Sequence, residues 1–187
     1  TEYNKLLKIR KDSLNKVLSL VGNYYTSREN ENLDFNINLN GVDISFVNSF
    51  TKKTLSRVGG KVNGDVLVTG SLKQMVLNGD AIVYDGSCNI DYLNTYYKIN
   101  PLDTKYNNIN PSIKFSKNRI DCSDIILVDS LNNHAVAQAV ITHEYLKNFR
   151  FDVDATLDNF ISMNMIPEEN STFYGTAVAS GDLKIEG

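Results

Sequence analysis

Residues 149–158 read FRFDVDATLD, and this stretch decides the fold class of the chain. Apolar residues occupy every second position, and Arg, Asp or Thr stand between them. Because successive side chains of a β-strand point to opposite faces, this period of two predicts a strand with one apolar and one wetted face. LDFNINLN at 33–40 repeats the pattern with Asp and Asn on the polar side. Such strands are typical of antiparallel or solenoid-like sheets, not of parallel sheets buried on both faces.

The same period extends over most of the chain after residue 33. It predicts further strands at 42–47, 61–69, 74–84, 87–93, 95–99, 112–116, 119–128, 134–142, 160–165 and 173–186. Turn-forming pairs separate most of them, namely Asn40-Gly41, Gly59-Gly60, Asn78-Gly79, Asp85-Gly86 and Asn132-Asn133. GDVLVTGSLK at 64–73 and GTAVASGDLK at 175–184 share Gly, Gly, Leu and Lys in register. This echo predicts one supersecondary unit used twice.

The first 32 residues follow a different pattern. Apolar residues recur every three or four positions between residues 2 and 21, which predicts an amphipathic helix that ends near Gly22. Two interpretations stay open: a surface helix docked on the core, or a basic helix on a membrane surface. We therefore expect a helix and linker at 1–32 and a β region at 33–187. The start at Thr1 and the end inside a strand-like pattern indicate a piece of a longer polypeptide.

Composition excludes several classes of protein. The chain has 187 residues, a formal net charge of -3, 42% hydrophobic residues and 22% charged residues. These values indicate a globular domain, and the lack of a basic run argues against a dedicated nucleic-acid binder. No apolar run reaches the roughly 18 residues that a membrane-spanning helix needs. The 24 Asn are unusual, because Asn is disfavoured inside regular structure; many of them fall in predicted turns or on the polar side of predicted strands.

Residues that could carry chemistry are few. The two histidines lack the spacing of a zinc helix, and the aspartates of 149–158 lack the glycine of a calcium loop. Cys88 and Cys122 have neither metal nor redox spacing, which leaves two free thiols or one disulfide. A tyrosine-rich centre leaves a carbohydrate-binding sandwich as a weaker possibility. We predict that the chain is not an enzyme and has no catalytic residue, metal or cofactor.

The apolar face of the strands must be covered, because no second run of helices follows. The sheet can fold into a sandwich, close as a barrel, or stay open and curved with an apolar concave face. In the last case the exposed patch would exceed the roughly 300–600 Å² found on a typical monomer, and a ligand or partner would cover it. Periodicity alone does not choose among these three.

Three stretches resemble the TamB family, within the AsmA-like group and in the form found in Bacteroidetes. GGKVNGDVLVTGSLKQMVLNGDAIVYDGSCNIDYLNTYY at 59–97 is similar to the family's glycine-spaced strands and "DYLNT" run. ITHEYLKNFRFDVDATLDNFISMNM at 141–165 and STFYGTAVASGDLKIEG at 171–187 resemble its later segments. Residues 1–32 show no such resemblance.

The resemblance implies a mainly β fold, an open curved sheet or β-taco with an apolar groove. It also implies a periplasmic segment of a translocation and assembly module, anchored in the inner membrane of a Gram-negative bacterium. The implied partners are phospholipid acyl chains, an Omp85-type outer-membrane protein and nascent outer-membrane proteins. Lipid transport in outer-membrane biogenesis is the first hypothesis, and a scaffold for protein assembly or secretion by strand pairing is the second.

The groove hypothesis names thirteen candidates for contact with acyl chains. They are the best-phased apolar residues of the predicted strands and an adaptable Met-containing stretch: Phe35, Ile37, Leu39, Val66, Val68, Val83, Phe149, Phe151, Val153, Leu157, Phe160, Met163 and Met165.

Overall fold

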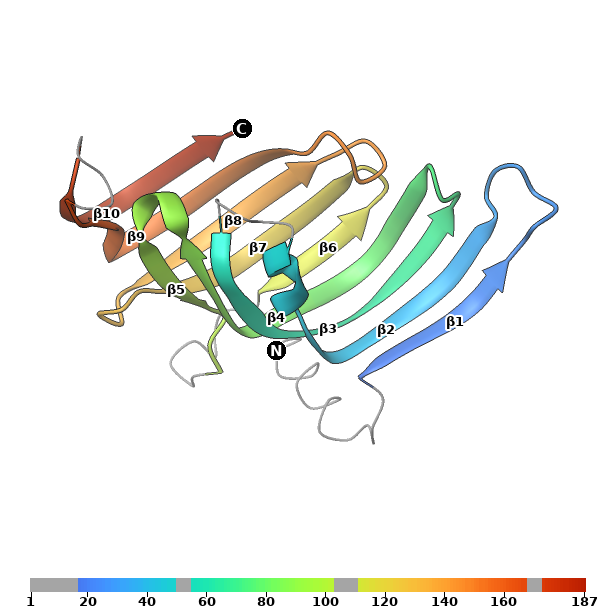
Figure 1. Cartoon of the computed structure of the whole chain (residues 1–187), viewed down its shortest axis with the longest axis horizontal. Helices are drawn as coiled ribbons and strands as arrows, with labels where there is room; N and C mark the ends of the chain where they lie inside the picture. Colours follow the sequence, from blue (N-terminus) through green and yellow to red (C-terminus); the bar gives the residue numbers. More distant parts are fainter. Residues whose placement is uncertain (1–16, 50–54, 103–110, 168–172) are drawn as a thin grey trace.

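A computed structural model describes residues 17–49, 55–102, 111–167 and 173–187 (Figure 1). In these ranges the chain forms one ten-stranded antiparallel sheet that runs β1-β2-β3-β4-β5-β7-β8-β9-β10, with β6 paired to both β4 and β7. The strands are β1 (Leu18–Tyr24), β2 (Leu33–Asp43), β3 (Leu55–Gly70), β4 (Met75–Ile90), β5 (Thr95–Ile99), β6 (Ser112–Ser116), β7 (Arg119–Val128), β8 (His134–Thr142), β9 (Arg150–Met165) and β10 (Gly175–Glu186). The mainly β, open antiparallel fold predicted from the sequence is confirmed.

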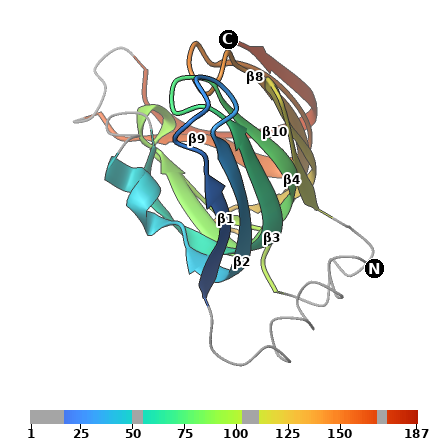
Figure 2. The same ribbon diagram turned by 90° about the vertical axis from the view of Figure 1, so that its right-hand side faces the viewer.

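Two short 3-10 helices complete the described part of the chain, η1 (Ser45–Ser49) and η2 (Asp91–Leu93). Figure 2 shows that η1, η2 and β5 lie to one side of strands β1–β4, so the sheet curves strongly. Four predicted strands have the observed bounds, at 95–99, 112–116, 119–128 and 134–142. The strand predicted at 42–47 is wrong beyond Asp43, where the chain enters η1.

The curvature has its origin in residues that the sequence predicted as turns. Asn40-Gly41, Gly59-Gly60 and Asp85-Gly86 lie inside strands, at or beside breaks in the pairing register, and only Asn132-Asn133 closes a hairpin. Gly41 and Gly60 have φ values of 74° and 128°, and Asp85 has 49°. Type I′ and II′ hairpin turns and G1-type β-bulges all use positive φ values, so the dipeptides alone do not distinguish them. Bulges bend a strand without ending it, and they explain why strands predicted as pairs are single strands of 16 residues.

Gly79 differs from these bulges, because its pairing with Val66 is regular. A Cβ atom built on Gly79 would lie 2.1 Å from the backbone oxygen of Asp65, and its φ is 146°. Glycine at this position therefore lets the backbones of β3 and β4 approach closely, as expected for a glycine within a strand.

One end of the sheet is closed by contact between β5 and β9. The Tyr97 ring stacks on the Phe160 ring, and both belong to a buried cluster with Ala135, Ala155 and Leu157. Tyr97 and Phe160 come from strands that do not pair with each other, so this contact folds the sheet onto itself.

The amino-terminal prediction is wrong where the structure can be compared with it. Residues 18–21, assigned to a helix, begin β1, and Gly22 lies within this strand opposite Phe35 and does not cap a helix. Leu18, Leu20 and Gly22 fit a period of two as well as neighbouring residues fit a helical period, and pairing with β2 decides between them. Residues 2–16 of the predicted helix lie outside the described residues.

The predicted repeat is also wrong. Gly70 ends β3 at the hairpin to β4, whereas its counterpart Gly181 lies inside β10 at a register shift with β9. The two segments therefore share sequence but occupy different structural positions.

Candidate functional site: an apolar groove

The apolar residues of the separate strands form continuous rows across the sheet. Paired residues of neighbouring antiparallel strands lie on the same face. One row crosses from β1 to β9 through Leu20, Ile37, Val66, Gly79, Phe115, Ile120, Ile141 and Phe151. A second row reaches β10 through Leu18, Leu39, Gly64, Ala81, Ile113, Cys122, Ala139, Val153 and Ile185. Every side chain in both rows is apolar or absent.

The row between these two faces the other way and, apart from Val140, is polar. It consists of Ser19, Asn38, Asp65, Asp80, Lys114, Asp121, Val140, Asp152 and Glu186. The Asn38 side-chain amide donates a hydrogen bond to the Asp65 carboxylate over 2.8 Å. Along these rows the two faces of the sheet therefore differ in the polarity of their side chains.

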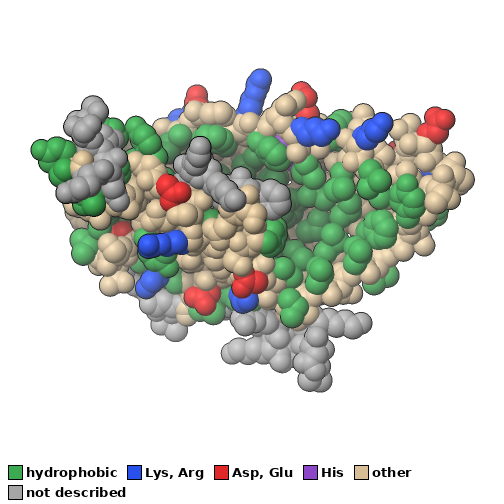
Figure 3. Space-filling view, viewed as in Figure 1, with side chains coloured by type: hydrophobic (Ala, Val, Ile, Leu, Met, Phe, Trp, Pro, Cys, Tyr) green, Lys and Arg blue, Asp and Glu red, His purple; other side chains and the backbone are tan. Residues whose placement is uncertain are grey.

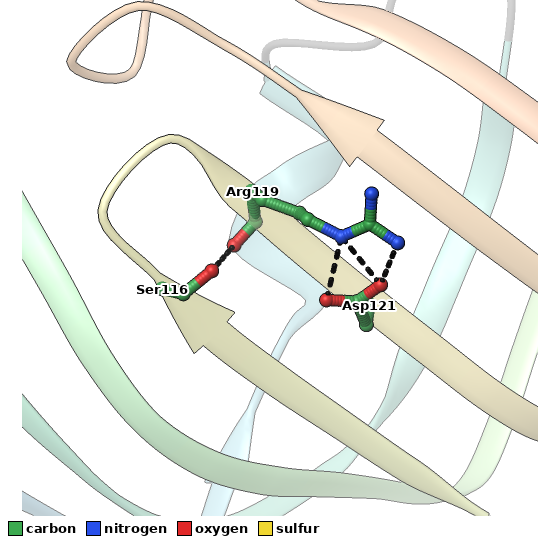
Figure 4. Close-up of polar contacts among 3 residues, drawn as sticks. All are labelled: Ser116, Arg119 and Asp121. Carbon is green, nitrogen blue, oxygen red and sulfur yellow. Dashed lines mark hydrogen bonds and ion pairs between the residues drawn. The ribbon is translucent and has the colours of Figure 1, made fainter.

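An ion pair at the start of β7 belongs to this polar face. The Arg119 guanidinium reaches Asp121 over 2.6 Å, and its Nε donates to the same carboxylate over 2.8 Å and 2.9 Å (Figure 4). Hydrogen bonding to Arg119 lowers the pKa of the Asp121 carboxyl and in turn raises the pKa of Arg119. Both side chains are at the surface, so this pair contributes little to stability.

The apolar face is hollowed over β2, β3 and β4, where hydrophobic side chains gather in Figure 3. Val66 and Val68 are each 6% exposed, while Leu18 and Leu20 on β1 are 57% and 59% exposed. The apolar side chains of this face are therefore buried on β3 and exposed to solvent on β1. We call this hollow, lined by the apolar rows of β1–β4, the groove.

The structure places the amino-terminal candidates together. Phe35 pairs with Val68, Ile37 with Val66 and Leu39 with Gly64, so that the five candidates from β2 and β3 lie on the groove face. Val83 joins them through its pairing with Val62. The β2 candidates and Val83 are half-buried.

The carboxy-terminal candidates divide into two groups. Phe149 precedes β9 and is 56% exposed, Phe151 is 45% exposed, and Val153 is half-buried on the same face. Leu157 and Phe160 are buried in the closed end. Met163 and Met165 lie on β9 beyond a further register shift, paired with Ala177 and Gly175. Burial therefore places Leu157 and Phe160 in protein packing, not on the open groove wall.

Sequence reasoning missed several residues of the groove face. Leu18 and Leu20 were assigned to the wrong element, and Phe115, Ile120 and Ile141 lie in predicted strands but were not selected. Their alternation with polar residues was a usable signal. Their position in a row with Ile37 and Phe151 was not visible, because strand pairing is not encoded in the period of one strand.

Other chemistry-bearing residues have structural surroundings. His143 is 5% exposed, its Nδ1 accepts a hydrogen bond from the Leu146 backbone over 3.2 Å, and its ring lies 5.6 Å from that of Phe149. Cys88 and Cys122 are free thiols on the apolar face, and burial raises the pKa of Cys88 to about 11. Across the ranges that the structure describes, no group of three or more His, Cys, Asp and Glu could hold a metal ion. Within the same ranges, no helix is long and apolar enough to span a bilayer.

An open antiparallel sheet with one continuous apolar face defines a groove-forming protein of the β-taco type. The family model described as the TamB C-terminal domain matches residues 8–113, more than half of the chain. The chain therefore belongs to the TamB family, membrane-associated translocation and assembly modules of the Gram-negative envelope. Neither the curated proteins nor the solved structures gave a significant match.

The extent of the match differs from the resemblance seen in the sequence. The stretch 59–97 lies inside the matched range, whereas 141–165 and 171–187 lie outside it. Residues 8–32, in which no resemblance was noted, are included. This inclusion agrees with the pairing of β1 to β2, which makes residues 18–24 part of the same sheet.

Proposed function

We propose that this chain is a non-catalytic, periplasmic segment of an inner-membrane-anchored protein, and that its groove carries phospholipid acyl chains between the two membranes. The observation that supports this proposal is the pair of continuous apolar rows on an open sheet. Acyl chains would lie on these rows, while headgroups face the solvent at the groove opening. The function would support outer-membrane biogenesis, without a cofactor and without binding nucleic acid.

The energetics are sufficient for this role. Each buried methylene contributes about 0.8 kcal/mol, so part of one acyl chain gives several kcal/mol before ordering costs. A row of aliphatic side chains offers similar contacts at each strand, because neighbouring strands repeat about every 4.8 Å. A bound chain could therefore shift along the groove without passing a polar barrier over β1–β4.

Photo-crosslinking at neighbouring positions tests the proposal. A benzophenone amino acid at Ile37 lies on the groove face, and the same amino acid at Asn36 lies on the polar face. We expect phospholipid adducts at Ile37 and at Ile120, and background levels at Asn36 and Asp121. Equal labelling on both faces would contradict a lipid-carrying groove.

A second function is favoured by the exposed edge of β10. This strand has 12 residues, none of them buried, and among the described residues it pairs only with β9. An exposed edge of this length can accept another strand. The chain would then act as a scaffold that pairs with nascent outer-membrane strands or with an Omp85-type partner during assembly or secretion.

The two functions make different predictions for groove variants. With the crosslinker at position 120, Ile37→Asn should strongly reduce lipid adducts, but strand pairing along β10 should survive it. Crosslinkers placed along β10 that capture a barrel protein equally well in the wild type and in Ile37→Asn would favour the scaffold.

A further inference from the structure

A separate polar cavity lies where β5 diverges from β7. These strands pair only at Lys98 with Val128 and at Ile99 with Leu127. Nearer its start, β5 is bridged to β9 by side chains: the Tyr97 hydroxyl donates to the Ile161 carbonyl over 2.8 Å. The Asn94 side-chain amide likewise donates to the backbone oxygen of Asn164 over 3.0 Å. The residues of both bridges line a cavity of about 210 Å³.

One wall of this cavity carries a buried hydroxyl with no partner. Thr95 is 2% exposed, and its Oγ1 lies near the Tyr97 hydroxyl yet has no hydrogen-bond partner. Leaving a buried polar group unsatisfied is costly, so such an atom usually marks a place for a ligand or a water molecule. Asn89, Tyr96 and Ser130 add further polar groups to the lining.

Arg57 supplies the positive charge among the lining residues. It lies at the bulge of β3 with φ of 53°, and it is an exposed residue at the edge of the cavity. The positive charge of Arg57 also acts on the nearby Asp91 carboxyl. Hydrogen bonds from Ser56 and Asn89 lower the pKa of Asp91, and the charge of Arg57 lowers it less strongly. A guanidinium is the side chain best suited to bind a phosphate oxygen pair.

The second charged residue of the lining is already occupied. Asp129 is 3% exposed, and its two oxygens accept hydrogen bonds from the backbone N–H groups of Leu131, Asn133 and Ile161. Asp129 therefore holds the β7–β8 turn against β9 and is not free to bind a cation. Its charge, with that of Asp91, opposes the attraction of Arg57 for an anion, and this repulsion is stronger for a dianion than for a monoanion.

We propose that this cavity binds the phosphodiester group of a phospholipid headgroup, with Arg57 as its charge partner and Thr95 as a hydrogen-bond donor. A phosphodiester carries one negative charge, so it fits the mixed charges of the site better than the largely dianionic inorganic phosphate. Tyr97 connects the site to the closed end. Its ring stacks on Phe160, and its hydroxyl donates to the carbonyl of Ile161, which lines the cavity. This headgroup assignment rests on the proposed lipid-carrying function.

Deacylated headgroups test the site without involving the groove. Glycerophosphoglycerol and inorganic phosphate would each be titrated into the isotope-labelled chain, with backbone amide shifts of residues 94–97 and 130 as the readout. We expect glycerophosphoglycerol to bind more tightly than inorganic phosphate. Arg57→Gln should weaken its binding at least tenfold and Thr95→Val several-fold, whereas Arg150→Gln on the polar face should change it less than twofold.

Several results would overturn the proposal. Unchanged affinity in Arg57→Gln, no shifts with glycerophosphoglycerol, or inorganic phosphate binding as tightly would each exclude a phosphodiester site. Amide spectra of the unliganded variants control for misfolding, and a variant with altered dispersion would be replaced by Arg57→Lys, for which we expect a smaller loss of affinity.

Failure of the headgroup site and failure of the groove are distinguishable. Laurate, which has an acyl chain but no phosphate, would be titrated in parallel and followed at residues 35–39. Glycerophosphoglycerol binding without laurate binding would keep the phosphodiester site and contradict the groove. The opposite result would keep the groove and contradict the phosphodiester site.

Discussion

The rings of Tyr97 and Phe160 stack with their centroids 4.8 Å apart and their planes 21° from parallel. This contact joins β5 to β9, which are separated by β7 and β8 in the order of the sheet. At this contact the apolar face of the sheet is buried in protein packing, whereas over β1–β4 it is open as the groove. The hydrogen bond from the Tyr97 hydroxyl to the Ile161 carbonyl is a second link between β5 and β9.

Removing the Tyr97 hydroxyl should weaken this closure. Tyr97→Phe keeps the stacked ring but leaves the Ile161 carbonyl without its donor, so we expect a loss of about 1–2 kcal/mol in the free energy of unfolding. Urea denaturation measures this loss. Tyr96→Phe is the matched control, because Tyr96 is 39% exposed and should change by less than about 0.5 kcal/mol. Equal effects in the two variants would mean that the bridge to Ile161 does not stabilise the closed end.

The close approach of β3 and β4 at Gly79 can be tested with a single methyl group. Gly79→Ala combines an unfavourable φ with a Cβ 2.1 Å from the Asp65 oxygen, and we expect a loss of about 3 kcal/mol or more. Gly175→Ala has a similar φ, 118°, but its Cβ would meet nothing within 4 Å. It should therefore cost about 1 kcal/mol. Thermal unfolding of both variants separates steric clash from backbone strain, and a smaller loss at Gly79 would contradict the clash.

Neighbouring residues on β2 should respond differently to the same polar side chain. Asn36→Ser lies on the polar face and should change the free energy of unfolding by less than about 0.5 kcal/mol. Ile37→Ser places a hydroxyl in the apolar row and removes most of a half-buried side chain, for an expected loss of about 1–2 kcal/mol. Chemical denaturation under one buffer condition compares them. A larger loss at Asn36 would reverse the assignment of the two faces.

Stability should fall at alkaline pH because of Cys88. Burial raises the pKa of its thiol from 9.0 to about 11 in the folded state, so above pH 9 the unfolded chain loses this proton more readily. The favourable contribution of the neutral thiol is complete below pH 9 and is lost as the pH rises through 11, up to about 2 kcal/mol. Cys88→Ala should flatten the decline between pH 9 and 11 in a series of urea titrations. An unchanged slope would mean that other groups cause it.

The strands were predictable because each one alternates on its own. The clean period in 149–158 and the matching bounds at 119–128 and 134–142 come from side-chain chemistry within a single segment. The bulges at Gly41 and Asp85 were not predictable as bulges, because they use the same backbone conformation as a turn. Distinguishing them requires knowledge of the partner strand.

The groove was partly predictable and the polar cavity was not. Ile37 and Val66 were identified from alternation, and strand pairing joined them into one row with Leu20 and Phe115. Arg57 and Thr95 have no common motif and lie 38 positions apart in the sequence. They line one cavity only because a bulge in β3 and the divergence of β5 from β7 bring them together.

The apolar rows run perpendicular to the strands, which has a consequence for how such a protein can vary in size. The path across the sheet grows with the number of strands, by roughly 10 Å for each added hairpin, whereas its width depends on strand length. Insertion or deletion of whole hairpins would therefore change the length of the groove in fixed steps while its cross-section stays constant. The number of hairpins therefore sets the length of the groove.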